Sequence, residues 1–268
     1  MDDAHPPVTT AVTTVSTAPT RAVIRVTGAD RVGFLSNLVS NDLNGPGQGL
    51  SYTALLTPQG KYLADFFVLD RGEDLLIDVA QSLAPVLAQR LSMYTLRADV
   101  GLEMTELTVS RGLGTAPEGA GGDPRHPELG WRAYGLEAAQ EPGIDWDAIR
   151  VAHCVPETGI ELISGEGYIL EAGFERLNGV NHRKGCYVGQ EVTARMKHKT
   201  ELRKGLVTVE IEGEAAQGTQ ITAEGRAVGT LYTQAGGRAI AHLRFDKARD
   251  RELSAGAATL RWNGTLPG

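Results

Sequence analysis

The C-terminal quarter of the chain constrains the fold most, because it consists of short strand-like runs separated by glycine turns. Turns are indicated at Glu212-Gly213, Glu224-Gly225 and Gly236-Gly237, where glycine adopts positive φ without steric cost. Closely spaced short strands with such turns are typical of a small barrel. The predicted strands are Gly205–Glu212, Thr219–Ala223, Arg226–Gln234, Arg238–Arg244 and Ala258–Trp262. We therefore predict a C-terminal β-barrel over residues 203–268.

The N-terminal part of the chain mixes strands with helices. Over residues 21–111 the apolar periodicities predict the order strand, helix, three strands, helix and strand. Two of these strands flank Thr57-Pro58-Gln59-Gly60, which has the composition of a hairpin turn. Hairpin-connected strands with interspersed helices favour an α+β unit over a doubly wound parallel sheet.

Three further segments complete the predicted organisation. Residues 112–127 are dense in Gly and Pro and are interpreted as a linker, and residues 128–202 as a second α+β segment. Residues 1–20 are interpreted as a disordered lead. This lead lacks a cationic start, and its Asp2 and Asp3 disfavour a mitochondrial presequence. No apolar run approaches the roughly 20 residues that span a bilayer, so we expect a cytoplasmic protein without a membrane partner.

The composition limits the possible functions. The chain has 268 residues, of which 41% are hydrophobic and 22% charged, enough for two or three packed units. A formal net charge of −7 disfavours a general nucleic-acid binder. With two cysteines in a chain of this length, a disulfide framework is not expected and the thiols should be free.

The segment Lys184–Glu191 reads KGCYVGQE and concentrates the reactive chemistry of the chain. A thiol beside a cation can form a thiolate, so Lys184 and Arg195 are predicted to favour that state of Cys186. Gly185 and Gly189 are predicted to shape the turn and to let a ligand approach the backbone. Side chains at Gln190 and Glu191 are predicted to fix the loop by hydrogen bonds. The alternative interpretation is a buried, inert thiol.

Metal binding by this chain alone is not indicated. His182 and Cys186 are four residues apart and His153 adjoins Cys154, but no CxxC pair exists. Iron–sulfur clusters and structural zinc usually need four protein ligands. No stably bound metal is therefore expected, and Cys186 is at most a transient ligand shared with a partner.

Asp65 is a second candidate site residue. It lies within an apolar strand, on the same face as Leu63 and Phe67 by alternation. An acid on an apolar face is a site candidate when it is buried. A solvent-facing position at the sheet edge remains the alternative.

The chain resembles the YgfZ family, folate-binding proteins linked to iron–sulfur cluster assembly or repair and related to the glycine-cleavage T-protein, an aminomethyltransferase. The octapeptide matches the family signature K-G-C-[FY]-x-G-Q-E at every specified position. Weaker supporting stretches are Leu55–Lys61, Asp123-Pro124-Arg125, Leu129–Arg132, Glu171-Ala172-Gly173 and Asn178-Gly179-Val180.

The resemblance implies two α+β units and a small barrel around a central channel that accepts tetrahydrofolate, with Cys186 at the channel mouth. It implies Cys186, Lys184 and Asp65 as candidate catalytic residues. The folate contacts that it implies are Asp65, Arg150, Gly185, Tyr187, Gly189, Gln190, Glu191 and Arg195.

The chain also departs from its relatives. Asp65 alone remains of a paired acid in the T-protein, and Trp146 replaces the first arginine of a stretch in which Arg150 matches the second. These departures disfavour ordinary aminomethyl transfer. Cys154 stands where the YgfZ family usually has glycine, so the local turn is expected to differ.

We therefore predict a folate-binding accessory protein that supports assembly or repair of iron–sulfur proteins, with Cys186 as a reactive or transiently ligating thiol. Its partners would be folate and iron–sulfur client or assembly proteins. An enzyme is less expected. The alternatives are folate-dependent, aminomethyltransferase-like transfer that depends on Asp65, and a tRNA-modification factor, supported only by the basic run Arg195–Lys199.

Overall fold

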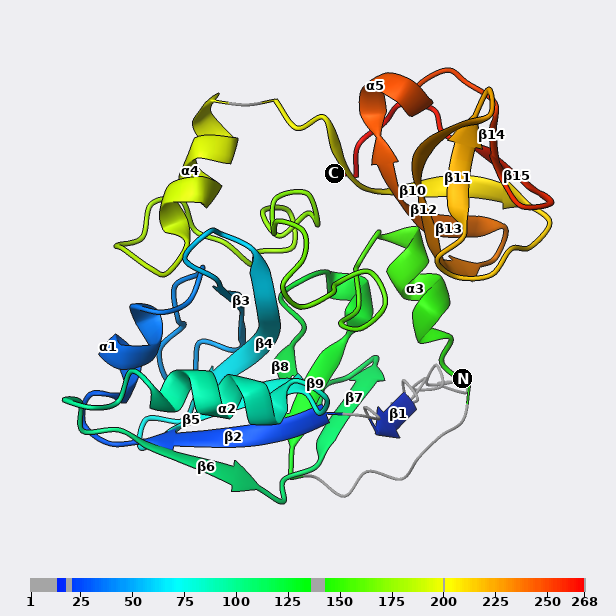
Figure 1. Cartoon of the computed structure of the whole chain (residues 1–268). Helices are drawn as coiled ribbons and strands as arrows, with labels where there is room; N and C mark the ends of the chain where they lie inside the picture. The colour runs from blue at the N-terminus through cyan, green and yellow to red at the C-terminus, as the bar shows by residue number, and fades with distance from the viewer. Residues whose placement is uncertain (1–13, 18–20, 136–142, 200, 268) are drawn as a thin grey trace, which may run out of the picture.

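A five-stranded antiparallel sheet forms the N-terminal unit of the computed structural model, which describes residues 14–17, 21–135, 143–199 and 201–267 (Figure 1). Its strands follow the order β3-β4-β5-β2-β6. They are β2 (Arg21–Thr27), β3 (Ser51–Leu56), β4 (Tyr62–Asp70), β5 (Leu75–Ala80) and β6 (Gly101–Thr105), and the helices of the unit are α1 (Arg31–Ser36) and α2 (Ala84–Ser92). This order of strands and helices confirms the predicted one.

The two faces of this sheet pack against different neighbours because side chains alternate along each strand. Phe66 of β4 joins Leu35 of α1 and Leu87 of α2 in one apolar cluster. The next residue, Phe67, points the opposite way, into the cluster that connects the sheet to the rest of the molecule. Asp65 lies on this second side, 3% exposed. Strand β4 is therefore buried on both faces, and Asp65 is not at a solvent edge.

A second, smaller sheet has the order β1-β7-β9-β8. Its strands are β1 (Thr14–Thr17), β7 (Val109–Leu113), β8 (Gly121–Gly122) and β9 (Trp131–Tyr134). The helices in the middle of the chain are η1 (Pro127–Leu129), α3 (Trp146–Ala152) and α4 (Gln190–Lys199). The prediction that the N-terminal segment is disordered is wrong for Thr14–Thr17, because this strand pairs with β7 along its whole length. The rest of that lead, residues 1–13 and 18–20, lies outside the described residues.

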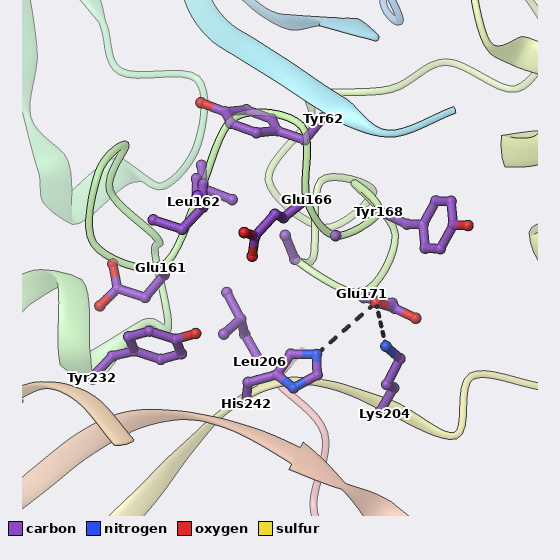
Figure 2. A pocket seen from close by; sticks show the side chains of 13 residues that line it. Tyr62, Glu161, Leu162, Glu166, Tyr168, Glu171, Lys204, Leu206, Tyr232 and His242 are labelled. Carbon is purple, nitrogen blue, oxygen red and sulfur yellow. Dashed lines mark ion pairs between the residues drawn. The ribbon is translucent and has the colours of Figure 1, made fainter. Parts of the chain in front are cut away.

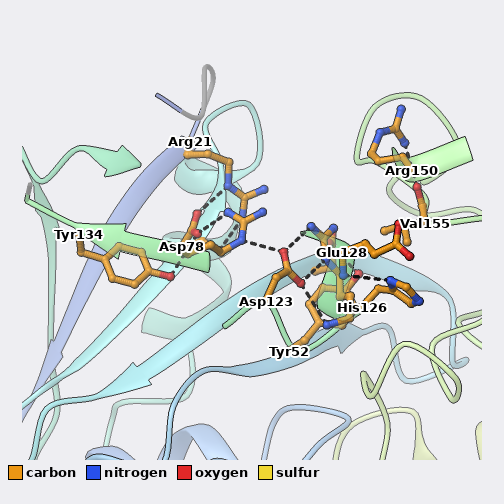
Figure 3. A network of polar contacts seen from close by, with 12 residues as sticks. Arg21, Tyr52, Asp78, Asp123, His126, Glu128, Tyr134, Arg150 and Val155 are labelled. Carbon is orange, nitrogen blue, oxygen red and sulfur yellow. Dashed lines mark hydrogen bonds and ion pairs between the residues drawn. The ribbon is translucent and has the colours of Figure 1, made fainter. Parts of the chain in front are cut away.

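The predicted linker 112–127 contains part of the core rather than a free connection. Asp123 accepts hydrogen bonds from Arg125 and Arg132, and Arg132 also donates to Asp78 of the first sheet at 3.0 Å. Figure 3 labels the two acids of this network, Asp78 and Asp123. Burial opposes ionisation of Asp123, but the two guanidinium groups hold its pKa down at about 2. These paired charges join the two sheets, which explains why this Gly- and Pro-rich segment is ordered.

The C-terminal residues form a closed barrel, as predicted (Figure 1). Its strands are β10 (Lys204–Glu212), β11 (Gln220–Ala223), β12 (Arg226–Ala235), β13 (Arg238–Arg244), β14 (Leu253–Ala255) and β15 (Ala258–Arg261), with α5 (Phe245–Ala248) after β13. The sequence patterns did not predict β14 or α5, which are too short to show a periodicity. Among the described residues, no helix combines the length and apolar character needed to cross a membrane.

Candidate functional site

The loop that carries Cys186 is anchored to α1 by Lys184. The Lys184 ammonium donates to the backbone carbonyls of Ser36 and Val39 at 2.7 Å and of Asn41 at 2.9 Å. Partial burial lowers the pKa of Lys184 to about 8. No hydrogen bond joins Lys184 to the thiol in the described part of the chain. The structure therefore gives Lys184 a role different from the predicted one: it holds the loop rather than polarising the thiol.

The thiol of Cys186 is free and exposed, so the alternative of a buried thiol does not apply to it. The Gln190 side chain donates to the carbonyl of Gly185 at 3.4 Å and closes the loop, as predicted. Tyr187 is turned inward and is 8% exposed. The loop thus presents its sulfur while neighbouring side chains fix its backbone.

The two charged residues of α4 that were assigned to this site pair with each other. Glu191 and Arg195 form an exposed ion pair at 2.8 Å, four residues apart on the helix. Such exposed pairs add little to stability, and neither side chain makes a described hydrogen bond to the loop. The predicted hydrogen bond from Glu191 to the loop is therefore wrong.

The hairpin between β3 and β4 packs directly against the Cys186 loop. A Cβ added to Gly189 would lie 2.6 Å from the carbonyl oxygen of Thr57, and one added to Gly60 would lie 2.8 Å from Val192 Cβ. Both glycines have positive φ, so only glycine fits either position without strain. Two stretches that were quoted separately for the family resemblance therefore form one structural unit.

The same hairpin reaches a cavity on its other side. Lys61 Nζ lies 3.8 Å from the ring centroid of Tyr168, and the two residues form an isolated antiparallel bridge. Tyr168 lines a cavity of about 250 Å³ between the irregular segment 161–172 and the barrel (Figure 2). Other residues that line it include Tyr62, Glu161, Glu166, Glu171, Lys204, Tyr232 and His242.

The carboxylates of this cavity differ in how far they are neutralised. Glu171 lies 3.5 Å from Lys204 and 4.0 Å from His242 (Figure 2). Glu161 is buried and accepts from Arg150 and Thr233. Glu166 points into the cavity in Figure 2, and its carboxylate has no hydrogen-bond or ion-pair partner among the described residues. The cavity can therefore accept donor groups of a ligand at Glu166.

Asp65 lies behind this cavity and does not line it. Its carboxylate accepts hydrogen bonds from Tyr52 at 2.9 Å, Tyr62 at 2.7 Å and Thr158. Burial and the neighbouring Asp65 charge raise the pKa of both tyrosines, which remain protonated donors. Asp65 therefore positions Tyr62, the side chain that does reach the cavity.

Arg150 is a buried structural residue that connects neighbouring segments. It is 2% exposed and donates to Glu161 at 3.1 Å and to Thr233 of β12 at 2.9 Å. It therefore ties α3 and the cavity segment to the barrel. Sequence reasoning missed Glu166, Tyr168 and Tyr232, because no motif or apolar periodicity marks their positions.

Comparison with known proteins identifies the family to which this chain belongs. The iron–sulfur cluster assembly factor IBA57, mitochondrial, of Mus musculus is 30% identical over 274 residues, covering 84% of this chain and 76% of the relative. The chain belongs to the IBA57 family. The human protein of the same name is 29% identical over 273 residues, covering 85% of this chain and 77% of the relative.

Other matches agree with this family at the level of the fold. The barrel matches the family model "CAF17, C-terminal beta-barrel domain" over residues 203–264. The IBA57 homologue of Mycosarcoma maydis is 30% identical over 224 residues, which cover 70% of this chain but only 55% of that longer relative. The glycine cleavage system aminomethyltransferase T of Bartonella henselae superposes with a TM-score of 0.75 at 13% identity, covering 96% of this chain and 87% of that one. The predicted T-protein-like α+β fold is therefore confirmed.

Proposed function

We propose that this chain is an accessory factor in the assembly of iron–sulfur proteins and that Cys186 is its working thiol. The observation that carries the proposal is an exposed sulfur on a loop that is anchored at Lys184 and packed against a glycine hairpin. Family relatives named as iron–sulfur cluster assembly factors support it. We propose a non-catalytic role, in a cytoplasmic setting; the relatives are described as mitochondrial.

In this proposal the iron–sulfur cluster is a substrate that this chain holds together with a partner. Iron–sulfur clusters usually take four protein ligands, and the described residues contain no group of three or more His, Cys, Asp or Glu side chains arranged to hold a metal ion. Cys186 would therefore contribute one thiolate, and a partner or small molecule would contribute the other ligands. The Lys184 anchor keeps that thiolate at a defined place on the surface.

A complementation assay tests the role of the thiol. In a strain that lacks this protein, Cys186→Ala should fail to restore the activity of radical-type iron–sulfur enzymes, whereas Cys154→Ala should restore it. Both variants should accumulate to the level of the unaltered protein. Full restoration by Cys186→Ala would remove the thiol from the function.

We further propose, in line with the YgfZ resemblance, that the cavity beside Tyr168 binds tetrahydrofolate. The 2-amino group and the adjacent ring N–H of a pterin are paired donors, which suit an unpaired carboxylate such as Glu166. Tyr62, Tyr168 and Tyr232 line the cavity and supply aromatic surface for a flat bicyclic ring. Glu166 and these tyrosines would hold and orient the folate, whose one-carbon chemistry belongs to the cofactor itself.

Calorimetric titration with tetrahydrofolate tests this part separately. Glu166→Gln should weaken binding on the order of tenfold, the loss expected for a charge-assisted pair of hydrogen bonds. Glu214→Gln, an exposed acid next to the barrel, is the matched control and should bind as the unaltered protein does. Equal affinities for the Glu166 and Glu214 variants would exclude this cavity as the folate site and leave the thiol proposal intact.

A further inference from the structure

A second cavity, of about 310 Å³, lies where the end of α3 meets the tail of the barrel. It does not share a lining residue with the cavity at Tyr168. Its lining residues are His126, Ala152, His153, Cys154, Arg176, Thr208, Asn263, Thr265, Leu266 and Pro267. Neither the family resemblance nor the proposed function uses this place.

The cavity contains a guanidinium group without a carboxylate partner. Arg176 donates to the backbone carbonyls of His153, at 2.9 Å, and of Cys154. No acid lies within ion-pair distance of Arg176 in the described part of the chain. Burial lowers the pKa of Arg176, although arginine remains charged in proteins. A partly buried charge held only by neutral carbonyls is a site that favours an added anion.

Two histidine rings lie in the same wall, and His126 accepts the backbone N–H of Glu128 at its Nδ1, 3.2 Å away, which leaves its Nε2 as the donor for a ligand. His126 and His153 stack with ring centroids 3.7 Å apart and planes inclined by 20°. His153 Nε2 lies 2.9 Å from the Glu128 carboxylate, in a geometry that leaves the ring nitrogen without a hydrogen bond. Glu128 is 67% exposed, so it neutralises the rim and not the interior.

The tail of the barrel closes the cavity with neutral polar groups. Asn263 uses its side-chain oxygen to accept the backbone N–H of Thr265 at 2.9 Å, which leaves its amide hydrogens for a ligand. Thr208 donates its hydroxyl to the Val151 carbonyl. The Asn263 amide therefore supplies a donor to the space in addition to Arg176.

From these contacts we propose that this cavity binds a small anionic group, a phosphate or a carboxylate, with Arg176 as its main partner and His126 and Asn263 as secondary partners. A bound anion would neutralise Arg176 and satisfy the imidazole and amide donors together. It would also connect Arg176, in the central segment, to the tail of the barrel.

Titration calorimetry and thermal unfolding of the full chain test this proposal, with inorganic phosphate and glutamate as separate probes at constant ionic strength. At least one of the two probes should bind saturably to the protein and raise its melting temperature. Arg176→Gln should weaken binding about tenfold or more, the loss expected for a charge-assisted pair. Arg97→Gln removes an exposed cation of the N-terminal unit that lines neither cavity, and it should bind as the unaltered protein does.

The variants separate the possible outcomes. If Arg176→Gln fails to fold because it loses its two carbonyl contacts, His126→Gln and Asn263→Ala should each still weaken binding by about threefold. A preference for phosphate or for glutamate identifies the group that the site takes. Absence of saturable binding by both probes, or an equal loss in Arg97→Gln, would overturn the proposal.

Discussion

The two cysteines of this chain have opposite environments. Cys186 is exposed, whereas Cys154 is 1% exposed between α3 and the barrel. Burial raises the pKa of Cys154 to about 11, and the nearby Arg176 offsets this only in part. Cys154 thus remains a protonated thiol at neutral pH, whereas the sulfur of Cys186 is open to a partner.

The comparison shows that a cation near a thiol in sequence is a poor guide to its chemistry. Lys184 is two residues before Cys186, but its ammonium donates hydrogen bonds to backbone carbonyls at and just after the end of α1. Arg176 is far from Cys154 in sequence, but it contacts the Cys154 carbonyl. Exposure, which the sequence does not show, separates the two thiols.

The largest expected difference is in the rate of alkylation. In the folded protein, iodoacetamide should modify Cys186 at least about a thousandfold faster than Cys154, because Cys154 reacts only after the structure opens. Mass spectrometry of timed samples measures both rates, and denaturant should make them similar. Comparable rates without denaturant would show that Cys154 is not buried in solution.

A smaller effect is expected from loosening the Cys186 loop. Lys184→Met removes three hydrogen bonds from an ammonium and should lower complementation on the order of tenfold while the fold is kept. A spin label on Cys186 should become more mobile in this variant. Arg183→Met, which changes the neighbouring exposed cation, is the control. Unchanged label mobility in Lys184→Met would contradict the anchoring role.

The smallest effect is expected at the buried thiol itself. Cys154 has a φ of 49°, which costs a non-glycine residue about 1–2 kcal/mol. Cys154→Gly relieves this strain but removes a buried side chain, so the free energy of unfolding should change by less than about 1 kcal/mol. Cys154→Val should destabilise the protein by more than about 2 kcal/mol. Chemical denaturation measures both, and a stable valine variant would contradict the strain.

The helices and strands were predictable from the sequence, because apolar residues recur in them at a regular spacing. The five barrel strands that were predicted end within one or two residues of the expected limits, since glycine turns separate most of them. The expected change of the turn at Cys154 does not occur, because Cys154 keeps the left-handed backbone that glycine would adopt at this position.

The irregular parts were not predictable. Segment 155–180 is a series of turns held by backbone hydrogen bonds such as Phe174 N to Ile169 O, so Glu166 and Tyr168 show no periodic signal. The inward direction of Asp65 depends on hydroxyl groups from Tyr52 and Thr158, which are remote in sequence. Contacts of this kind arise only when distant segments meet.

The close backbone contact between Gly60 and Gly189 has a consequence for protein engineering. Because the Cys186 loop and the β3–β4 hairpin have complementary shapes, the octapeptide transplanted alone into another scaffold would lack the surface that gives it its form. A functional graft would have to include residues 55–61 together with 184–192. The smallest portable unit of this chain is therefore two segments that are separated by nearly half of the protein's sequence but are in close backbone contact at Gly60 and Gly189.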